Sequence, residues 1–98
     1  MDRPSLAQAL THRDAVLRAF VGEDGRLLAV PTKLSKRLVV LDLIAQEFEI
    51  GRRYSEAEVN AVMWRFHDDH AALRRYLVEN EFLERGDGYY WRAGGPVD

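Results

Sequence analysis

The stretch from Tyr54 to Arg92 restricts the fold of this sequence more than any other, because it contains both a helix start and a regular apolar repeat. Ser55, followed three residues later by Glu58, forms a capping box, in which side chain and backbone satisfy each other's free groups at the start of a helix. Apolar residues then recur at the i, i+3, i+4, i+7 spacing of one helical face, at Val59, Val62, Met63 and Phe66. The pattern predicts a helix that begins at Ser55 and has one buried side.

A second helix and a hairpin are predicted to follow this helix. His67-Asp68 offers another N-cap, and from Asp69 onward the helical spacing repeats at Leu73, Tyr76, Leu77 and Asn80. The turn pair Asp87-Gly88 then separates a short apolar run from the aromatic-rich segment 89–92, which favours a β-hairpin. Helix, turn, helix and hairpin is the order of a winged helix-turn-helix, and residues 52–54 would add the short strand that completes its sheet.

The first half of the chain supplies two further elements. Ser5 or Thr11 could cap an extra N-terminal helix that ends near Gly22, and residues 26–30 are expected to form an edge strand or an extended arm before Pro31. Residues 33–48 are apolar on nearly all sides, which predicts a helix surrounded by other elements. The expected fold class is α+β: a winged helix-turn-helix-like domain with a small antiparallel β-sheet and an extra N-terminal helix.

Composition limits the size and the setting of the domain. The 98 residues, 47% apolar and 31% charged, suit one globular domain over residues 1–98, with flexible tails at 1–4 and 93–98. The sequence has no cysteine and no run near the roughly 18 apolar residues of a membrane span, so we expect a cytoplasmic protein without a membrane partner. Dimerisation is plausible, because so small a domain buries little surface alone.

Catalysis and metal binding are not predicted. The sequence contains no P-loop, glycine-rich dinucleotide turn, HExxH or GxSxG motif, so we expect neither an enzyme nor a cofactor. His67, Asp68, Asp69 and His70 have the ligand types of a transition-metal site, but their spacing is not specific and no third histidine is near. We therefore predict no metal site there, and capping is the simpler role for the two aspartates.

Candidate DNA contacts come from the second helix of the pair, which would be the recognition helix. With Leu73 and Leu77 turned inward, its outward face carries Asp68, Ala71, Arg75 and Val78. The predicted DNA-binding residues are Arg74 and Arg75 on this helix, Arg85 and Arg92 beside the wing, and Lys33, Lys36 and Arg37 as phosphate contacts. Two alternatives remain. Arg74 and Arg75 could pair with nearby carboxylates such as Glu79 or the Asp68-Asp69 pair, and the positively charged turn at residues 33–37 could merely be solvated.

The charge balance opposes generic DNA binding. The formal net charge is -2, and residues 54–72 alone carry one arginine against four carboxylates. Such a balance leaves room only for a local basic patch.

The aromatic residues are expected to serve mainly in packing. Tyr90 lies on one face of the return strand and its neighbours lie on the other, and at least one of these faces is expected to lie in the core. Trp64 lies at the edge of its helix's apolar face, where it could contact the N-terminal helix or a second subunit.

Three motifs carry a resemblance to a known family. They are GRLxxxPxKxxKR over residues 25–37, GRxYxExEVN over 51–60 and FHDDxxxLRRxLV over 66–78. With these motifs the segment from about Val16 to Arg92 resembles a bacterial domain family of unknown function that occurs alone or attached to ArsR-type transcriptional regulators. The resemblance implies a winged-helix-like domain associated with transcription regulation, and it implies no catalytic residue and no cofactor.

Two functional hypotheses follow from these observations. The first is a transcriptional regulator that binds double-stranded DNA directly, or is associated with it, through a winged-helix domain. The second is a winged-helix interaction module without direct DNA binding, with a homodimer or a regulatory protein as the partner. In the second case the N-terminal helix and Trp64 would lie in the interface, and the arginines would form intramolecular pairs.

Overall fold

A computed structural model describes residues 4–96 as an α+β, winged-helix-like domain. Within these residues the elements are, in chain order, α1 (Leu6–Leu10), α2 (Arg13–Phe20), α3 (Leu34–Ala45), β1 (Arg53–Ser55), α4 (Glu56–Phe66), α5 (His70–Glu79), β2 (Leu83–Gly86) and β3 (Tyr89–Arg92). From α3 onward this is the order helix, strand, helix, helix and hairpin that the sequence predicts. The predicted fold class is therefore confirmed.

The sheet is small and antiparallel, with the strand order β1-β3-β2. Tyr90 on the central strand pairs with Tyr54 on one side and with Arg85 on the other. Asp87 and Gly88, which connect β2 and β3, both have positive φ, at 52° and 82°. Positive φ at both central residues defines the type I′ turn, whose twist matches that of the flanking strands. The predicted hairpin and the third strand from residues 53–55 are both confirmed.

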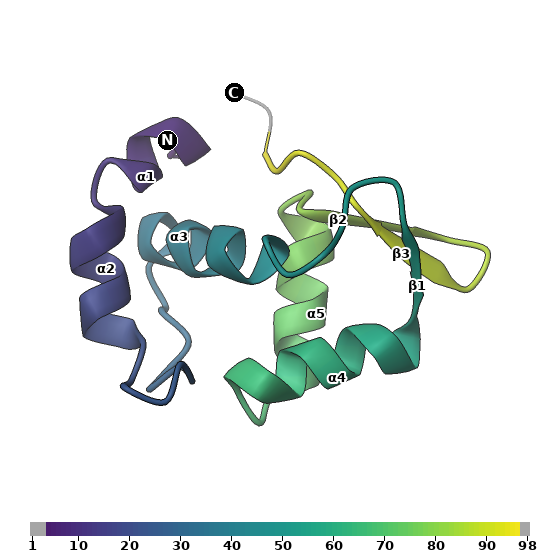
Figure 1. The fold of residues 1–98 in the computed structure, drawn as a ribbon. Coiled ribbons are helices and arrows are strands. Elements are labelled where there is room, and N and C mark those ends of the chain that lie inside the picture. Colours follow the sequence, from purple (N-terminus) through teal and green to yellow (C-terminus); the bar gives the residue numbers. More distant parts are fainter. Residues whose placement is uncertain (1–3, 97–98) are drawn as a thin grey trace.

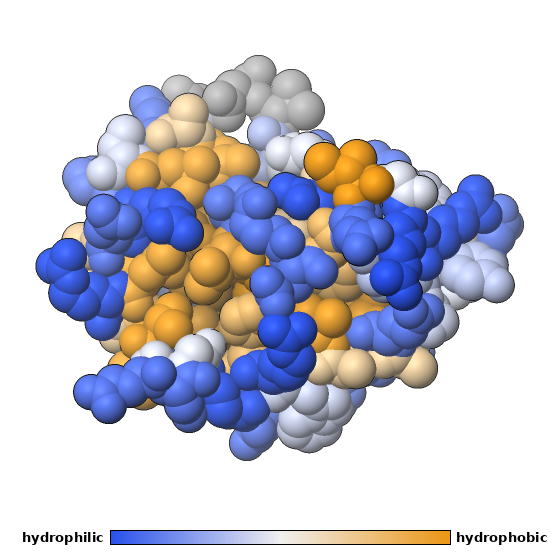
Figure 2. Space-filling view, in the orientation of Figure 1, coloured by the Kyte–Doolittle hydropathy of each residue, from blue (hydrophilic) through white to orange (hydrophobic). Residues whose placement is uncertain are grey.

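α3 lies at the centre of the domain. Leu38, Val39, Val40, Leu41 and Ile44 are at most 1% exposed, so this helix is buried on nearly all sides, as its sequence predicts. It packs against α1, α2 and α5 (Figure 1). On the face drawn in Figure 2, apolar residues lie over α2 and α3, whereas the end formed by the hairpin is hydrophilic.

The N-terminal part differs from the prediction of one helix, because a turn at Thr11-His12 divides it into α1 and α2. Ser5 caps α1 in a capping box with Gln8. The Thr11 hydroxyl donates to the carbonyl of Gln8 at 2.7 Å, and the amides of Thr11 and His12 each bond three residues back, at 3.2 Å. Such i→i+3 bonds tighten the end of a helix. The two short helices then lie along α3 at one end of the molecule (Figure 1).

Residues 26–30 form an arm that bends at Leu28 and Ala29, and not a strand. Its regular pairing is limited to an isolated bridge between Val21 and Leu27. The amide of buried Leu27 donates to the carbonyl of Phe66 at 2.7 Å, so the arm is held against the end of α4.

The expectation of flexible tails at 1–4 and 93–98 falls partly on residues 1–3 and 97–98, which lie outside the described residues. Ala93 and Gly95 donate backbone hydrogen bonds to Phe82 and Glu81. No helix within residues 4–96 has the length and the apolar character that crossing a bilayer requires.

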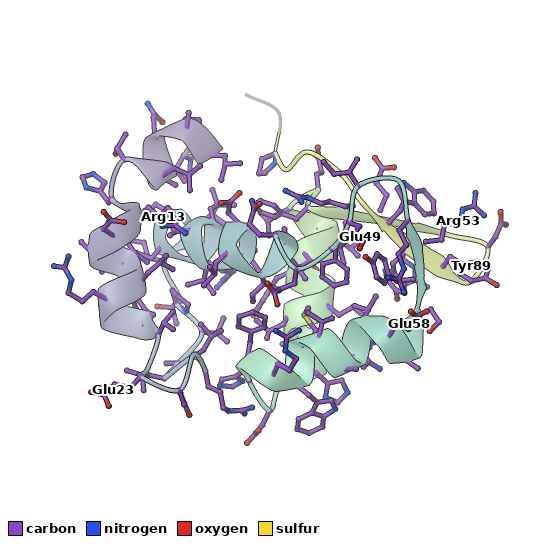
Figure 3. All side chains as sticks on the ribbon, in the orientation of Figure 1. Arg13, Glu23, Glu49, Arg53, Glu58 and Tyr89 are labelled. Atoms are coloured by element: carbon purple, nitrogen blue, oxygen red, sulfur yellow. The ribbon has the colours of Figure 1, made fainter. Side chains whose placement is uncertain are left out.

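The capping box at the start of α4 gives a pH-dependent prediction. The Ser55 amide donates to the Glu58 carboxylate at 3.0 Å, and this bond, the Ser55 hydroxyl and nearby Arg52 hold the pKa of Glu58 below its ordinary value of 4.5 (Figure 3). A lowered folded-state pKa adds stability that is fully present above pH 4.5 and is lost as the pH falls through the folded pKa. We expect Glu58→Gln to remove this acid-dependent loss, which urea midpoints at several pH values below 5 measure against Glu23→Gln as the control.

Candidate nucleic-acid interface

α5 presents the outward face that helical periodicity predicts. Leu73 and Leu77 are fully buried, whereas Ala71 and Arg75 are exposed. The helix begins after Asp69, whose side chain accepts the amide of Ala72 at 3.2 Å. Asp69 is therefore the N-cap, one residue later than the predicted His67-Asp68, and the outward face lies beside the hairpin.

Two adjoining cavities lie between α5, the start of α4 and the hairpin. One, of about 290 Å³, is lined by Ala71, Arg74, Arg75, Val78, Glu79, Arg85 and Tyr90. The other, of about 300 Å³, is lined by Glu56, Arg85, Gly86, Asp87, Gly88, Tyr89 and Tyr90. They share Arg85 and Tyr90, so they form one surface, which we call the α5–hairpin groove. This groove brings together three of the seven predicted DNA-binding residues: Arg74, Arg75 and Arg85.

The groove arginines differ in how firmly their own chain holds them. The Arg85 guanidinium lies 5.6 Å from the centroid of the Tyr90 ring, and among residues 4–96 no carboxylate lies within ion-pair distance of it. Arg75 pairs with Glu79 one helical turn away at 3.7 Å, with both side chains more than half exposed. A pair this exposed contributes only about 0.3–0.5 kcal/mol, so a stronger anion could displace Glu79.

Arg74 instead connects the two helices. Its Nη1 donates a short hydrogen bond to Asn60 Oδ1 on α4, and its Nη2 lies 3.7 Å from Glu56 Oε1. The side chain is 23% exposed. Both its hydrogen-bonding and its ionic partner thus belong to α4, which is the intramolecular alternative that the sequence left open for this residue.

We expect Arg74→Ala to lower the free energy of unfolding by about 1–2 kcal/mol, because it removes the bond that joins α4 to α5 and leaves Asn60 without that donor. Urea denaturation measures this difference. Arg75→Ala is the matched control, since the neighbouring exposed arginine should change stability by no more than about 0.5 kcal/mol. Equal stabilities of the two variants would contradict the structural role of Arg74.

Two other predicted contacts use their guanidinium groups within the chain. Arg92 donates to the carbonyl of Phe48 at 3.1 Å and to the Gln46 side chain at 3.2 Å, which joins β3 to the end of α3. Arg37 donates to the carbonyls of Pro31 and Thr32 at 3.0 and 3.2 Å, and it lies 4.3 Å from the centroid of the Tyr76 ring. These bonds use part of the N–H donors of each guanidinium and hold both side chains against their own chain.

The lysines lie at the other end of the domain. Lys36 lies 5.9 Å from the centroid of the Phe20 ring on α2, and both lysines line a cavity beside α1. The hairpin forms the opposite end of the molecule (Figure 1). Lys33 and Lys36 are therefore not part of the α5–hairpin groove.

The segment 67–70 is engaged in local contacts. Asp68 pairs with Arg26 at 2.7 Å, and the ring of His67 accepts the Asp69 amide at 3.0 Å. The rings of His70 and Trp64 stack with centroids 4.7 Å apart. Within residues 4–96, no three histidine or carboxylate side chains gather in a way that could hold a metal ion.

Sequence reasoning missed the contribution of Arg26 to this segment. Its side chain donates to the carbonyl of Trp64 and to Asp68, so the arm holds the turn between α4 and α5. The two pairs of residues are 38 and 42 positions apart, and no local pattern indicates such a pairing.

On β3 the side chains alternate between the core and the surface, as predicted, since Tyr90 is 3% exposed and Tyr89 is 46% exposed.

Comparison with known proteins identifies one family. The family described as "Uncharacterized protein conserved in bacteria (DUF2087)" matches residues 26–92, which include α3 and all of the winged-helix core. This match begins at Arg26 rather than near Val16, so it leaves out α1 and α2. No curated protein and no solved structure matches the chain.

Proposed function

The chain belongs to the bacterial family DUF2087. Because the description of that family names no activity, we propose a function from the geometry of the chain. The domain binds double-stranded DNA through the α5–hairpin groove. The observation that carries this proposal is the groove itself. It gathers Arg75 from the helix and Arg85 from the hairpin, with Arg74 behind them. A winged helix uses these two elements, the recognition helix and the wing, when it binds a duplex.

The chemistry of the groove supports an anionic backbone as its partner. Arg85 is available as a donor, and Arg75 can exchange Glu79 for a phosphate at little cost, because the exposed pair is weak. Arginine also fits a phosphate or a guanine edge with two parallel hydrogen bonds. We assign Arg75 and Arg85 as the direct contacts and Arg74 as the residue that holds α5 against α4.

The start of α5 is acidic, and this determines how DNA would approach. Asp69 caps the helix and Asp68 pairs with Arg26, so the two carboxylates offset both the positive end of the helix dipole and the arginine. Little positive charge is left at this end to attract a phosphate. DNA would therefore contact the middle of α5 and the hairpin rather than the first turn of the helix. With a net charge of -2, the attraction for phosphates is confined to this local basic patch, which should bind any duplex weakly at low salt. The resemblance to domains attached to ArsR-type regulators supports the same role.

The test is an NMR titration of isotope-labelled protein with a mixed-sequence duplex. We expect the amide shifts to be confined to residues 71–79 and 84–90 at low salt and to fade as salt rises from about 50 to about 200 mM, because displaced counterions weaken phosphate contacts. If these amides do not shift at low salt while the protein stays folded, the α5–hairpin groove does not bind DNA.

A second candidate function is a protein-interaction module, and one specific observation favours it. Trp64 is 48% exposed, and exposed tryptophan is a residue type that protein interfaces favour. In that case the mass of the wild-type protein should increase with its concentration, and Trp64→Ala should reduce this increase. Sedimentation equilibrium in an analytical ultracentrifuge measures both. Ile50→Ala, a change at a residue that is 80% exposed and lies outside the N-terminal helices, is the control. A monomeric mass at every concentration would exclude a homodimer.

A further inference from the structure

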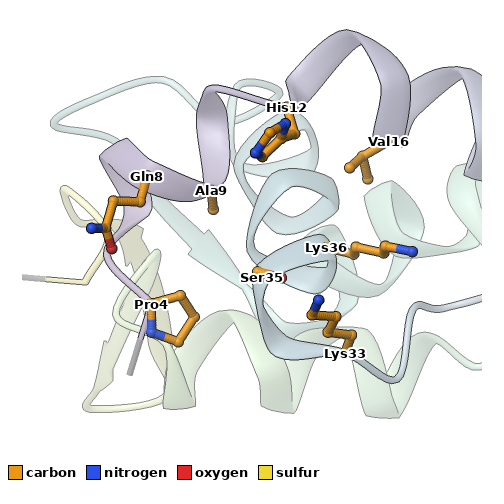
Figure 4. Close-up of a pocket in the computed structure, with 8 residues that line it drawn as sticks. All are labelled: Pro4, Gln8, Ala9, His12, Val16, Lys33, Ser35 and Lys36. Carbon is orange, nitrogen blue, oxygen red and sulfur yellow. The ribbon is translucent and has the colours of Figure 1, made fainter. Parts of the chain in front are cut away.

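The only two lysines of the sequence, Lys33 and Lys36, line the same cavity. This cavity of about 320 Å³ lies between α1, the start of α2 and the first turn of α3 (Figure 4). It is lined by Pro4, Gln8, Ala9, His12, Val16, Lys33, Ser35 and Lys36. A volume of this size is at the small end of the range for ligand pockets, so it suits a small molecule.

The wall of the cavity divides into an apolar part and a polar part. Ala9 and Val16, which are 3% and 7% exposed, supply the apolar part together with Pro4. Gln8, His12 and Ser35 supply polar atoms on either side. The described residues that line the cavity include no aspartate or glutamate. Two lysines beside an apolar surface, with no described carboxylate in the lining, favour an anion with an apolar body.

Both ammonium groups are available to such an anion. Within residues 4–96, no carboxylate lies within 4.0 Å of either lysine, whereas most of the arginines there have a hydrogen-bonding or ionic partner. Lys36 has one contact, 5.9 Å above the Phe20 ring, which is weak at an exposed site. The hydroxyl of Ser35 has no hydrogen bond within the same residues, so it can donate as well.

We propose that this cavity binds a small carboxylate that has an apolar substituent. Lys33 and Lys36 hold the carboxylate, Ser35 donates a further hydrogen bond, and Ala9 and Val16 contact the substituent. The site is separate from the α5–hairpin groove, so the inference does not depend on DNA binding.

The experiment is a titration of the full chain with benzoate at constant ionic strength, followed through the amides of residues 9, 16 and 35. The lysine side-chain ¹⁵N signals provide a second readout, because the chain has only two lysines. We expect saturable shifts in both sets of signals. Lys33→Gln/Lys36→Gln should raise the dissociation constant at least about ten-fold, as expected when a charged hydrogen-bonding partner is removed, whereas Arg13→Gln, a neighbouring cation that does not line the cavity, should change it less than about two-fold.

Benzamide and inorganic phosphate separate the two parts of the proposal. Benzamide keeps the ring and lacks the charge, and phosphate has charge without an apolar body, so both should bind at least about ten-fold more weakly than benzoate. Shifts with benzoate that do not saturate, or that persist in the double lysine variant, would overturn the site. Equal affinity for benzamide would overturn the role of the lysines, and equal affinity for phosphate would overturn the role of the apolar wall.

Discussion

Arg75→Glu is expected to weaken duplex binding at low salt by about 10- to 100-fold, which corresponds to about 1–3 kcal/mol, the usual value of one good arginine contact to DNA. The substitution removes a donor from the α5–hairpin groove and places a second carboxylate beside Glu79. The slope of log affinity against log salt should fall by about one, because one phosphate contact is lost. Fluorescence anisotropy with a labelled duplex at several salt concentrations measures both quantities.

The control for this prediction is Arg13→Glu, which makes the same change of net charge on α2. Figure 3 places Arg13 at the end of the molecule opposite the hairpin. Its pair with Asp14 is exposed, at 3.6 Å, so its loss should not unfold the domain. If both variants lose the same affinity, binding depends on net charge and not on the groove. If Arg75→Glu loses affinity only because it unfolds, its melting temperature will show it.

The parts of the fold that could be predicted from the sequence are those with local causes. The capping box at Ser55 and Glu58 fixes the start of α4, and Asp87-Gly88 fixes the type I′ turn, because each depends on residues close together in the chain. The burial of α3 follows from its all-round apolar sequence. The division of the N-terminal region at Thr11-His12 was not predicted, because the apolar spacing continues across it. The bonds that end α1 there are those of the Thr11 hydroxyl and of the Thr11 and His12 amides.

The candidate site was harder to predict, because its chemistry depends on contacts between distant residues. Helical periodicity placed Arg74 and Arg75 side by side on α5, yet Arg74 bonds Asn60 fourteen residues away while Arg75 pairs with Glu79 on its own helix. Arg92 bonds Phe48 across 44 residues. A sequence pattern gives the exposure of a helical face, whereas the partner of each charge depends on how α3, α4 and the sheet pack together.

Phe48→Ala is expected to lower the free energy of unfolding by about 3–5 kcal/mol, the usual cost of removing a buried phenylalanine ring. Phe48 is 1% exposed, and its ring meets that of Tyr54 edge to face with centroids 5.0 Å apart. The Tyr54 hydroxyl accepts the Glu49 amide at 2.8 Å, and Arg92 donates to the Phe48 carbonyl. The ring thus joins the segment after α3 to β1, whereas β3 is held through the Phe48 carbonyl, which the alanine variant keeps. Loss of the ring should therefore loosen the sheet that includes the hairpin with Arg85.

Ile50→Ala is the matched control, because this residue lies two positions further along and is 80% exposed. Urea denaturation should show a change of no more than about 0.5 kcal/mol for Ile50→Ala. A loss of about 3–5 kcal/mol is a large part of the total stability of a domain this small, so Phe48→Ala should also bind DNA more weakly at temperatures near its own melting point, through unfolding. Similar small losses for both variants would mean that the sheet is held to α3 by Arg92 and the backbone bonds rather than by the aromatic pair.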